Sequence, residues 1–315
     1  MAKYKGIQGY SVQKLSDDPT ASSDTEGQLW YNSSLGKFKV IAGGAGAWSS
    51  GGDLNTARSS FGSAKNATLT TALIFGGDQA PPPGKHNETE SYDGSTWTEV
   101  NNLTTARLGV SGAGLSTAAL AIGGNQGPPV NVDGKVEEYD GTSWTEGNDM
   151  THIGVARGTN GTTTAALASG GTYPPGRFAD VEIWNGTSWT ETANLLVATV
   201  YQAAAGTSTA AINAFGQVPG SPYVSKKNES WNGTSWTETT DGNTARYDCA
   251  AWGTSTAALV MGGTGDPPRY TLTEYWDGST WTELGDMATA RMGLAGCGTS
   301  SSGVVAGGTT PPGAK

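Results

Sequence analysis

Short apolar runs alternate with glycine-rich turns along most of the chain, and one unit of this pattern runs from Asn101 to Glu146. Small residues lead to a turn at 114–117, and the apolar run 118–122 then closes on two glycines. A stretch of alternating polar and apolar residues follows, and a second turn leads into the run 143–147. Runs of this length bounded by glycine, asparagine or aspartate predict short strands joined by tight turns. The unit is therefore predicted to form four antiparallel strands, called a, b, c and d in chain order.

The same unit recurs six times. The second glycine that closes strand b stands at positions 77, 124, 171, 263 and 308, and Gln217 takes its place in the fourth copy. The tryptophan near the start of strand d is a second marker: Trp48, Trp97, Trp144, Trp189, Trp236 and Trp281. Both markers recur about every 47 residues, which indicates a repeat architecture.

A four-stranded sheet cannot bury both of its faces alone, but sheets arranged around an axis cover one another, as in β-propellers. The order of the markers is an apolar run, then Gly-Gly, then a strand with Tyr or Trp, such as Tyr139, and a spaced Trp, such as Trp144. This order resembles kelch repeats from Gln28 to Gly308. The resemblance implies an all-β, kelch-like propeller with four antiparallel strands in each blade.

The first and last parts of the chain are predicted to close the ring together. Six copies contain strands a and b, but only five continue into strands c and d. Gln28–Asn32 resembles a strand c, and residues 46–54 align with residues 279–287. N-terminal strands would thus complete the last blade and cover its open edges. The sequence therefore predicts six blades.

This arrangement divides the chain into an N-terminal arm, residues 1–27, and a six-bladed propeller, residues 28–315. Residues 28–52 would complete the last blade. Lys37–Ile41 and Ala47–Ser50 are both candidates for its strand d.

Composition narrows the class of protein. Glycine accounts for 48 of 315 residues, and charged residues for only 15%. Disordered chains are rich in charge and poor in aromatics, and collagen needs glycine at every third position, so both are excluded. The net charge is −10 and the 18 Lys and Arg residues do not cluster, which argues against nucleic acid as a partner. No apolar run reaches the roughly 18 residues of a membrane span, and the first residues lack the apolar core of a signal peptide.

Four copies carry an arginine in Thr-Ala-Arg at the start of strand a: Arg58, Arg107, Arg246 and Arg291. Copies three and four carry Gly154 and Val200 there instead. A propeller would place these arginines near the inner rim of one face. They could bind carboxylates or sugar acids in a bidentate manner, or tie a loop to acidic residues of a neighbouring blade. Their regular repetition favours the structural role, because binding sites are usually built from irregular residues.

Prolines follow the Gly-Gly position in every copy and stiffen the loops between strands b and c. These loops share one face of the predicted propeller with the loops between strands d and a, and we call it the proline-loop face. Rigid loops lose little entropy on contact, which favours binding; the alternative is that the prolines only terminate strands. The candidate contact residues of this face are His86, Tyr173, Arg177, Tyr223, Arg269 and Tyr270.

Kelch-type propellers include copper-radical oxidases that resemble galactose oxidase, and these bind copper through two His and two Tyr, one of them crosslinked to Cys. Here His86 and His152 lie in different copies, and neither Cys249 nor Cys297 is placed as a crosslinking partner. Another relative epimerises sialic acid, and the Asp-Gly turns after strand c differ by one position from the sialidase Asp-box. The sequence therefore predicts no catalytic residue, no cofactor and no metal site, and it assigns both cysteines to the core.

Residues 17–37 resemble a segment near the start of tailed-phage structural proteins. The resemblance rests on Pro19, on Glu-Gly-Gln-Leu-Trp-Tyr-Asn at 26–32, and on Gly36-Lys37. It implies a non-catalytic structural or adhesion protein of the virion, such as a tail-fibre component. Its partners would be other virion proteins or a host surface glycan or protein, bound through the proline-loop face, and a homo-oligomer is compatible with this role. The alternatives are a lectin-like bacterial propeller and, with less support, an oxidase or a sialic-acid-modifying enzyme.

Overall fold

The computed structural model describes residues 13–15, 29–32, 37–40, 47–79, 84–127, 132–173, 176–220, 222–265 and 267–311. Every regular element among them is a β-strand. The chain forms two compact units, residues 1–47 and residues 48–315. Most of the predicted arm, residues 1–27, lies outside the described residues, so its role and its boundary stay predictions.

The first unit contains one three-stranded sheet, in the order β1 (Gln13–Leu15), β2 (Leu29–Asn32) and β3 (Lys37–Val40). β1 runs parallel to β2, and β2 pairs antiparallel with β3. The segment predicted as strand c of the last blade therefore pairs with β1 and β3. The connection between β2 and β3 is short, and strands joined in this way pair with each other as a hairpin.

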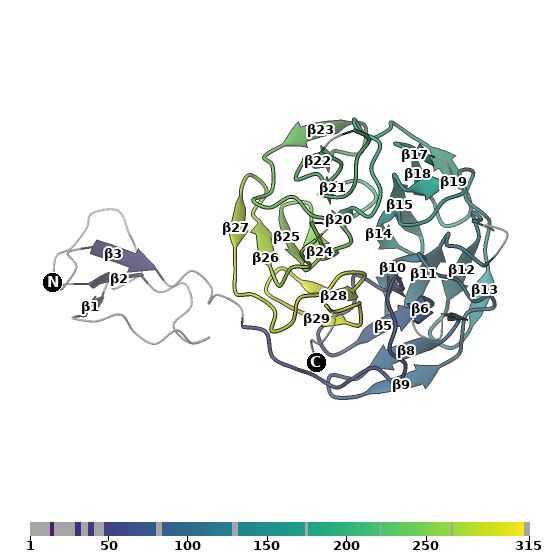
Figure 1. Cartoon of the computed structure of the whole chain (residues 1–315), viewed down its shortest axis with the longest axis horizontal. Coiled ribbons are helices and arrows are strands. Elements are labelled where there is room, and N and C mark those ends of the chain that lie inside the picture. The colour runs from purple at the N-terminus through teal and green to yellow at the C-terminus, as the bar shows by residue number, and fades with distance from the viewer. Residues whose placement is uncertain are drawn as a thin grey trace. The chain divides into compact units, whose positions relative to one another are not determined.

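The second unit is a ring of sheets around one axis (Figure 1). Five of the sheets have four antiparallel strands, which follow one another outward from the axis in chain order. Their strands are β4 (Gly62–Ser63), β5 (Ala72–Phe75), β8 (Thr89–Tyr92) and β9 (Trp97–Val100); β10 (Ser111–Leu115), β11 (Ala118–Ile122), β12 (Val136–Tyr139) and β13 (Trp144–Glu146); β14 (Gly158–Thr162), β15 (Ala165–Ser169), β18 (Val181–Trp184) and β19 (Trp189–Glu191); β20 (Ala203–Gly206), β21 (Ala211–Ala214), β22 (Asn228–Trp231) and β23 (Trp236–Thr239); β24 (Ala250–Thr254), β25 (Ala257–Met261), β26 (Thr273–Trp276) and β27 (Trp281–Glu283). Two short hairpins lie in the b–c loops of repeats one and three: β6 (Asp78–Gln79) with β7 (Gly84–Lys85), and β16 (Thr172–Tyr173) with β17 (Gly176–Arg177).

The sixth repeat forms only a two-stranded sheet, β28 (Ala295–Thr299) with β29 (Ser302–Ala306). The prediction of an all-β propeller with four-stranded antiparallel blades is confirmed, but complete four-stranded blades number five rather than six. The reason is that, within the described ranges, no strand pairs with the outer edge of β29.

Small residues on the inner strands and tryptophans on the outer strands explain how the sheets pack. A β-carbon on Gly112 would collide with the backbone of Ser63 in the preceding sheet, so glycine permits this close approach. Farther out, Trp144 meets Phe75 of the preceding sheet with ring centroids 4.8 Å apart. The taper from small to large side chains suits sheets that radiate from an axis.

A closed ring of backbone hydrogen bonds joins all six repeats at one end of the central channel. Each N–H of the ring donates to the carbonyl oxygen of the equivalent residue in the preceding repeat, over 2.8–3.2 Å, and the N–H of Ser60 closes the ring on Gly293. The six residues all adopt positive φ, between 53° and 65°. They are Ser60, Gly109, Ala156, Tyr201, Asp248 and Gly293.

The fourth repeat departs from the others in a different way from the one predicted. Phe215 has φ 62° and Gly216 has φ 101°, which match the first and second glycines of the other repeats. The N–H of Gly216 donates to the carbonyl oxygen of Arg246 in the next repeat. In the other repeats the second glycine makes this hydrogen bond, as Gly77 does to Arg107. The alignment that put Gln217 in the place of the second glycine is therefore wrong, and it is the first glycine that is replaced. The Phe215 ring packs 4.4 Å from the Arg246 guanidinium and 5.2 Å from the Trp281 ring, contacts that offset the strain of positive φ.

Ala156→Gly is expected to stabilise the protein by about 0.5–1 kcal/mol. The backbone of Ala156 has φ 56°, a left-handed conformation that costs a residue with a β-carbon about 1–2 kcal/mol. Glycine adopts this conformation without that cost and loses only conformational entropy. Ala166→Gly in β15, at a buried position without positive φ, is the control and is expected to destabilise. Urea unfolding of both variants measures the difference, and a destabilising Ala156→Gly would contradict the strain.

Candidate functional site

Three of the four predicted arginines are buried and paired with a glutamate on strand c of their own repeat. The pairs are Arg58 with Glu90, Arg107 with Glu137 at 2.8 Å, and Arg246 with Glu274 at 2.5 Å. All six side chains are at most 1% exposed. The partner lies in the same repeat rather than in a neighbouring blade. This arrangement agrees with the structural role that the sequence favoured.

Each pair fastens the connection between two sheets. Arg107 Nη1 donates to the carbonyl oxygens of Gly123 and Lys135, at 2.9 and 2.8 Å. The second carboxylate oxygen of Glu137 accepts the N–H of Thr104, at 2.7 Å, in the loop that arrives from the preceding sheet. Arginine therefore ties the end of strand b to strand c, and glutamate ties strand c to the incoming loop.

In the third repeat a different arginine, which the sequence analysis missed, lies near the glutamate, and its Nη2 donates to the carbonyl oxygen of His152 at 2.6 Å. Gly154 lacks a side chain, but Arg157 lies nearby, with Nη2 3.9 Å from Glu182 Oε1 and its guanidinium 4.8 Å from the Phe178 ring. Burial lowers the pKa of Arg157 to about 10. The glutamate on strand c was not a sufficient signal for this cation, because the fourth repeat keeps its glutamate, Glu229, with no arginine paired to it in the described residues.

The fourth repeat keeps the glutamate without an arginine. Glu229 accepts the N–H groups of Leu196 and Val197, at 2.8 and 3.2 Å. Burial raises the pKa of Glu229 above its ordinary value. Thr199, rather than the predicted Val200, holds the position of the arginine. The carbonyl oxygen of Thr199 accepts the N–H of Gly171, just as the carbonyl oxygen of Arg107 accepts the N–H of Gly77.

Arg291 is the exception among the four. It is half-buried, and its Nη1 donates to the carbonyl oxygen of Gly307 at 2.9 Å. No carboxylate in the described part of the chain forms an ion pair with it.

Basic side chains of the b–c loops form hydrogen bonds with the next repeat. Lys85 Nζ donates to Asn125 Oδ1 at 3.1 Å, and Arg177 donates to Val218 O at 3.2 Å and to Gln217. The predicted binding residue Arg269 likewise donates to the carbonyl oxygen of Thr310. These contacts join repeat one to two, three to four and five to six.

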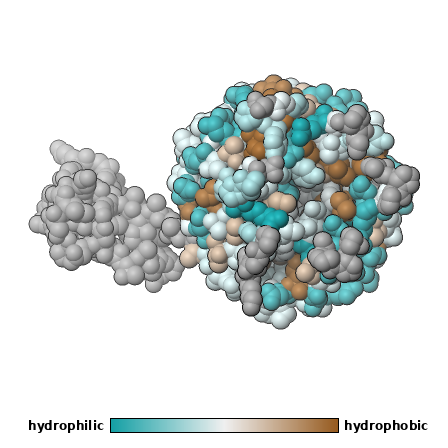
Figure 2. Space-filling model, viewed as in Figure 1, coloured by the Kyte–Doolittle hydropathy of each residue, from teal (hydrophilic) through white to brown (hydrophobic). Residues whose placement is uncertain are grey.

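The aromatic candidates differ in exposure. Tyr173 is 43% exposed, whereas Tyr223 and Tyr270 are half-buried. The His86 side chain is 11% exposed, and its Nδ1 lies 2.7 Å from Glu88 Oε2. Figure 2 shows apolar residues as small separate patches among hydrophilic ones on one face.

Much of the proline-loop face falls outside the described residues. The undescribed positions include Pro81–Pro83, Pro128–Pro129 and Pro174–Pro175. The assignment of ligand contacts to this face therefore stays a prediction.

One group of side chains has the composition of a metal site. Ligand atoms of His152, Asp180 and Glu191 lie within 4.8 Å of one another. His152 Nδ1 is also 3.8 Å from Glu182 Oε1. His86 is not part of this group, so the two histidines do not form the paired imidazoles of a copper oxidase.

Neither cysteine has the character of a reactive thiol. Cys297 is buried and Cys249 is partly buried, and both are free. Burial raises the pKa of each thiol to about 12. Because the thiolate is the nucleophile, both are unreactive near neutral pH.

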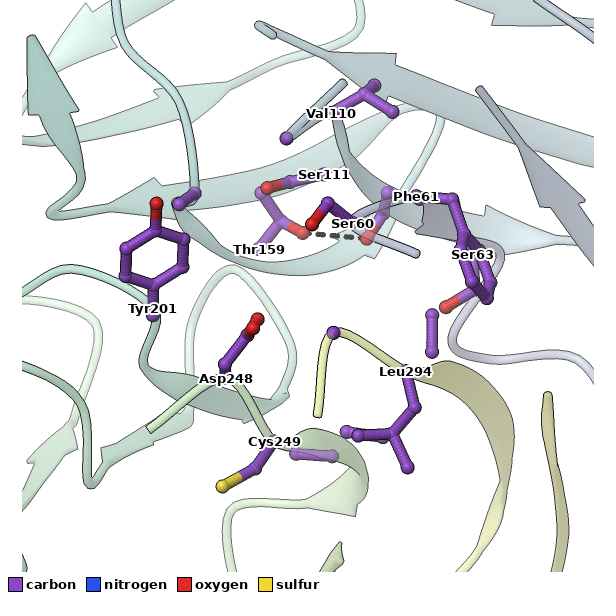
Figure 3. Close-up of a pocket in the computed structure, with 18 of the residues that line it drawn as sticks. Ser60, Phe61, Ser63, Val110, Ser111, Thr159, Tyr201, Asp248, Cys249 and Leu294 are labelled. Carbon is purple, nitrogen blue, oxygen red and sulfur yellow. Dashed lines mark hydrogen bonds between the residues drawn. The ribbon is translucent and has the colours of Figure 1, made fainter. Parts of the chain in front are cut away.

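The central channel holds a cavity of about 100 Å³, lined by the innermost strands and the hydrogen-bonded ring (Figure 3). Asp248 and Tyr201 of the ring line it beside each other in this view. Lys65 Nζ donates to the carbonyl oxygens of Thr159 and Ala204, at 3.0 and 3.3 Å, and so links the first repeat to the third and fourth. Burial lowers the pKa of Lys65 to about 8 and raises that of Asp248 to about 6.

Asp248→Asn is expected to stabilise the protein at pH 7.5 but not at pH 4. The folded carboxyl keeps its proton up to about pH 6, whereas the unfolded one loses it near 3.8, so stability falls as the pH rises between these values. Those pKa values set an upper bound of about 3 kcal/mol on the effect. Melting temperatures from pH 4 to 8 measure the effect, with the exposed Asp149→Asn as control. An equal effect at both ends of the range would contradict it.

No family model matches the chain, and no curated protein matches it. The described residues contain no helix long and apolar enough to cross a membrane.

Proposed function

We propose that the ring is a six-bladed, kelch-like propeller whose last blade takes its strand d from the segment around Trp48. Trp48 Nε1 donates to Thr273 Oγ1 at 3.0 Å, and Trp144 Nε1 donates to Thr89 Oγ1 at the same distance. In both cases the acceptor is the first residue of strand c in the preceding sheet. The N–H of Asn55 then reaches Glu90 at 2.8 Å, as the equivalent N–H does in the other repeats. These matches support Ala47–Ser50 over Lys37–Ile41 as strand d.

Trp48→Ala is expected to cost about 1–3 kcal/mol, because a half-buried indole loses its apolar contact and its hydrogen bond to Thr273. The exposed Ser50→Ala is the control and should leave stability unchanged. Thermal unfolding measures both. An unchanged transition in Trp48→Ala would remove the support for the sixth blade.

We propose that the propeller is a non-catalytic structural or adhesion protein of a tailed-phage virion, which binds a partner protein or host glycan through the proline-loop face. The supporting observation is the set of sideways contacts from Lys85, Arg177 and Arg269, which hold the loops in pairs. Loops held in this way lose little entropy on binding. Tyr173, on a short hairpin of this face, offers an exposed aromatic ring. The assignment to a virion rests on the resemblance of residues 17–37.

Two experiments test the two parts of this proposal. Mass spectrometry of purified particles tests the virion role, and absence of the chain from the particles would overturn it. Glycan arrays and binding to intact host cells test adhesion with Tyr173→Ala. Leu115→Ala, at an exposed apolar residue on the opposite face, is the matched control. Binding lost only in Tyr173→Ala supports the proline-loop face, and equal loss in both variants counts against it.

A further inference from the structure

The five complete sheets share one arrangement of strand c. In each of them, the glutamate of strand c stands opposite the next-to-last residue of strand b. The pairs are Ile74 with Glu90, Ala121 with Glu137, Ala168 with Glu182, Asn213 with Glu229 and Val260 with Glu274. In the sixth repeat this position on strand b belongs to Val305, which pairs with Gly296 of strand a as Ala121 pairs with Gly112.

In the part of the chain that the structure describes, no strand covers the outer edge of β29. Val304 and Val305 are half-buried, whereas the equivalent residues Leu120 and Ala121 are 0% exposed. Within the residues that the structure describes, β29 pairs only with β28. Its backbone groups on the other side are therefore a template for one more strand.

Arg291 lies in the same repeat as this edge. It keeps the contact with Gly307 that Arg107 makes with Gly123, but it lacks the carboxylate that Arg107 finds in Glu137. Ion pairs between arginine and carboxylate are strong and directional. A strand that carries glutamate opposite Val305 would complete the pair.

The segment predicted for this place cannot supply that carboxylate. When Gln28–Asn32 is aligned with the five strands c by its Tyr31, Leu29 falls where they have glutamate. A strand with a glutamate at this position would have to come from another segment.

Trp252 further defines the strand that fits. In the complete sheets, one residue of strand b stands opposite the aromatic residue of strand c, as Ala119 stands opposite Tyr139. Gly303 holds the equivalent position in the sixth repeat. The Trp252 ring already lies against Gly303, and a β-carbon there would collide with it. A small residue two places after the glutamate is therefore favoured over an aromatic one.

We propose that the edge of β29, with Arg291, is a binding site for an extended acidic segment of another protein. The segment adds to the sheet antiparallel to β29, places a glutamate opposite Val305 and pairs it with Arg291. This is β-strand addition, in which main-chain hydrogen bonds give affinity and side chains give selectivity. The site is on the edge of the sixth sheet and does not depend on ligand binding by the proline-loop face.

Titration of fluorescent peptides into the full chain tests the site. The probe is residues 135–141, Lys-Val-Glu-Glu-Tyr-Asp-Gly, together with its Glu137→Gln and Tyr139→Ser forms. We expect saturable binding of the first peptide, binding at least tenfold weaker for the Glu137→Gln form, and tighter binding for the Tyr139→Ser form. Arg291→Gln should bind the Glu and Gln peptides equally and weakly, while the control Arg269→Gln keeps the preference. Circular dichroism checks that both variants are folded.

Hydrogen exchange locates the binding. The amides of Gly303 and Val305, which alternate with those bonded to β28 and face the outer edge, should exchange quickly in the free chain and slowly with the peptide. No saturable binding, equal affinity for the Glu and Gln peptides, or an unchanged preference in Arg291→Gln would overturn the proposal. Slow exchange at these amides in the free chain would also overturn it, because the edge would then be filled by the chain itself or by a second copy. Sedimentation at several protein concentrations separates these two cases.

Discussion

Glu137→Gln is expected to destabilise the protein by about 3–5 kcal/mol, the cost of leaving one member of a buried ion pair without its partner. Arg107 is fully buried, and desolvation already lowers its pKa despite the attraction of Glu137. Without that carboxylate, its charge would face only neutral acceptors, such as the carbonyl oxygens of Gly123 and Lys135. Urea unfolding at pH 7 measures the loss.

Two matched substitutions isolate the cause. Glu229→Gln removes the same kind of buried acceptor but leaves no arginine unpaired, so its cost should be about 1–2 kcal/mol, that of a lost hydrogen bond. Glu146→Gln removes a surface partner of Lys135 and should change stability by less than about 1 kcal/mol. Equal costs for Glu137→Gln and Glu229→Gln would show that the ion pair with Arg107 contributes nothing to the free energy of unfolding.

Trp252→Ala is expected to cost about 3–5 kcal/mol and to loosen the sixth repeat selectively. The side chain is 1% exposed, its Nε1 donates to Thr299 O at 2.9 Å, and its ring lies against Gly296 and Gly303. Alanine is compatible with the backbone here, since Ala113 and Ala205 hold the same position opposite strand b. The loss is therefore a cavity rather than a misfolded strand.

Hydrogen exchange distinguishes a local from a general effect. Trp252→Ala should speed exchange in β28 and β29 before the other strands respond. Trp184→Ala removes an equally buried indole from the third sheet and should loosen that sheet instead. Uniform acceleration over all sheets in both variants would contradict the view that Trp252 anchors the sixth repeat.

Much of the fold could be predicted because its signals are local and repeated. The period of the tryptophans and the turns at Asp140 and Asn185 lead directly to the observed four-stranded sheets. Repetition of the arginines also indicated a structural role. The recurring tryptophans therefore led to the observed strands, whereas the recurring Gly-Gly pair led to the wrong alignment of Gln217.

The other features of the fold depend on interactions that different residue types can make, so no recurring residue marks them in the sequence. Ser60, Ala156 and Tyr201 share a left-handed conformation because backbone hydrogen bonds determine it, whatever the side chain. Arg157 replaces the missing arginine from a different position, since its long side chain reaches the same glutamate. Phe215 replaces a glycine because its ring gains contacts that offset the strain. The predicted pairing of Gln28–Asn32 overlooked the nearer strand available to it.

Because the hydrogen bonds between repeats form a closed ring, no repeat lies at an end of the array. In an open solenoid each repeat contacts only its neighbours, and the end repeats can fray alone. Here Ser60 of the first repeat is bonded to Gly293 of the sixth, so every repeat is held on both sides. Loss or duplication of one copy would leave this circle with the wrong curvature to close. The geometry therefore disfavours changes in copy number.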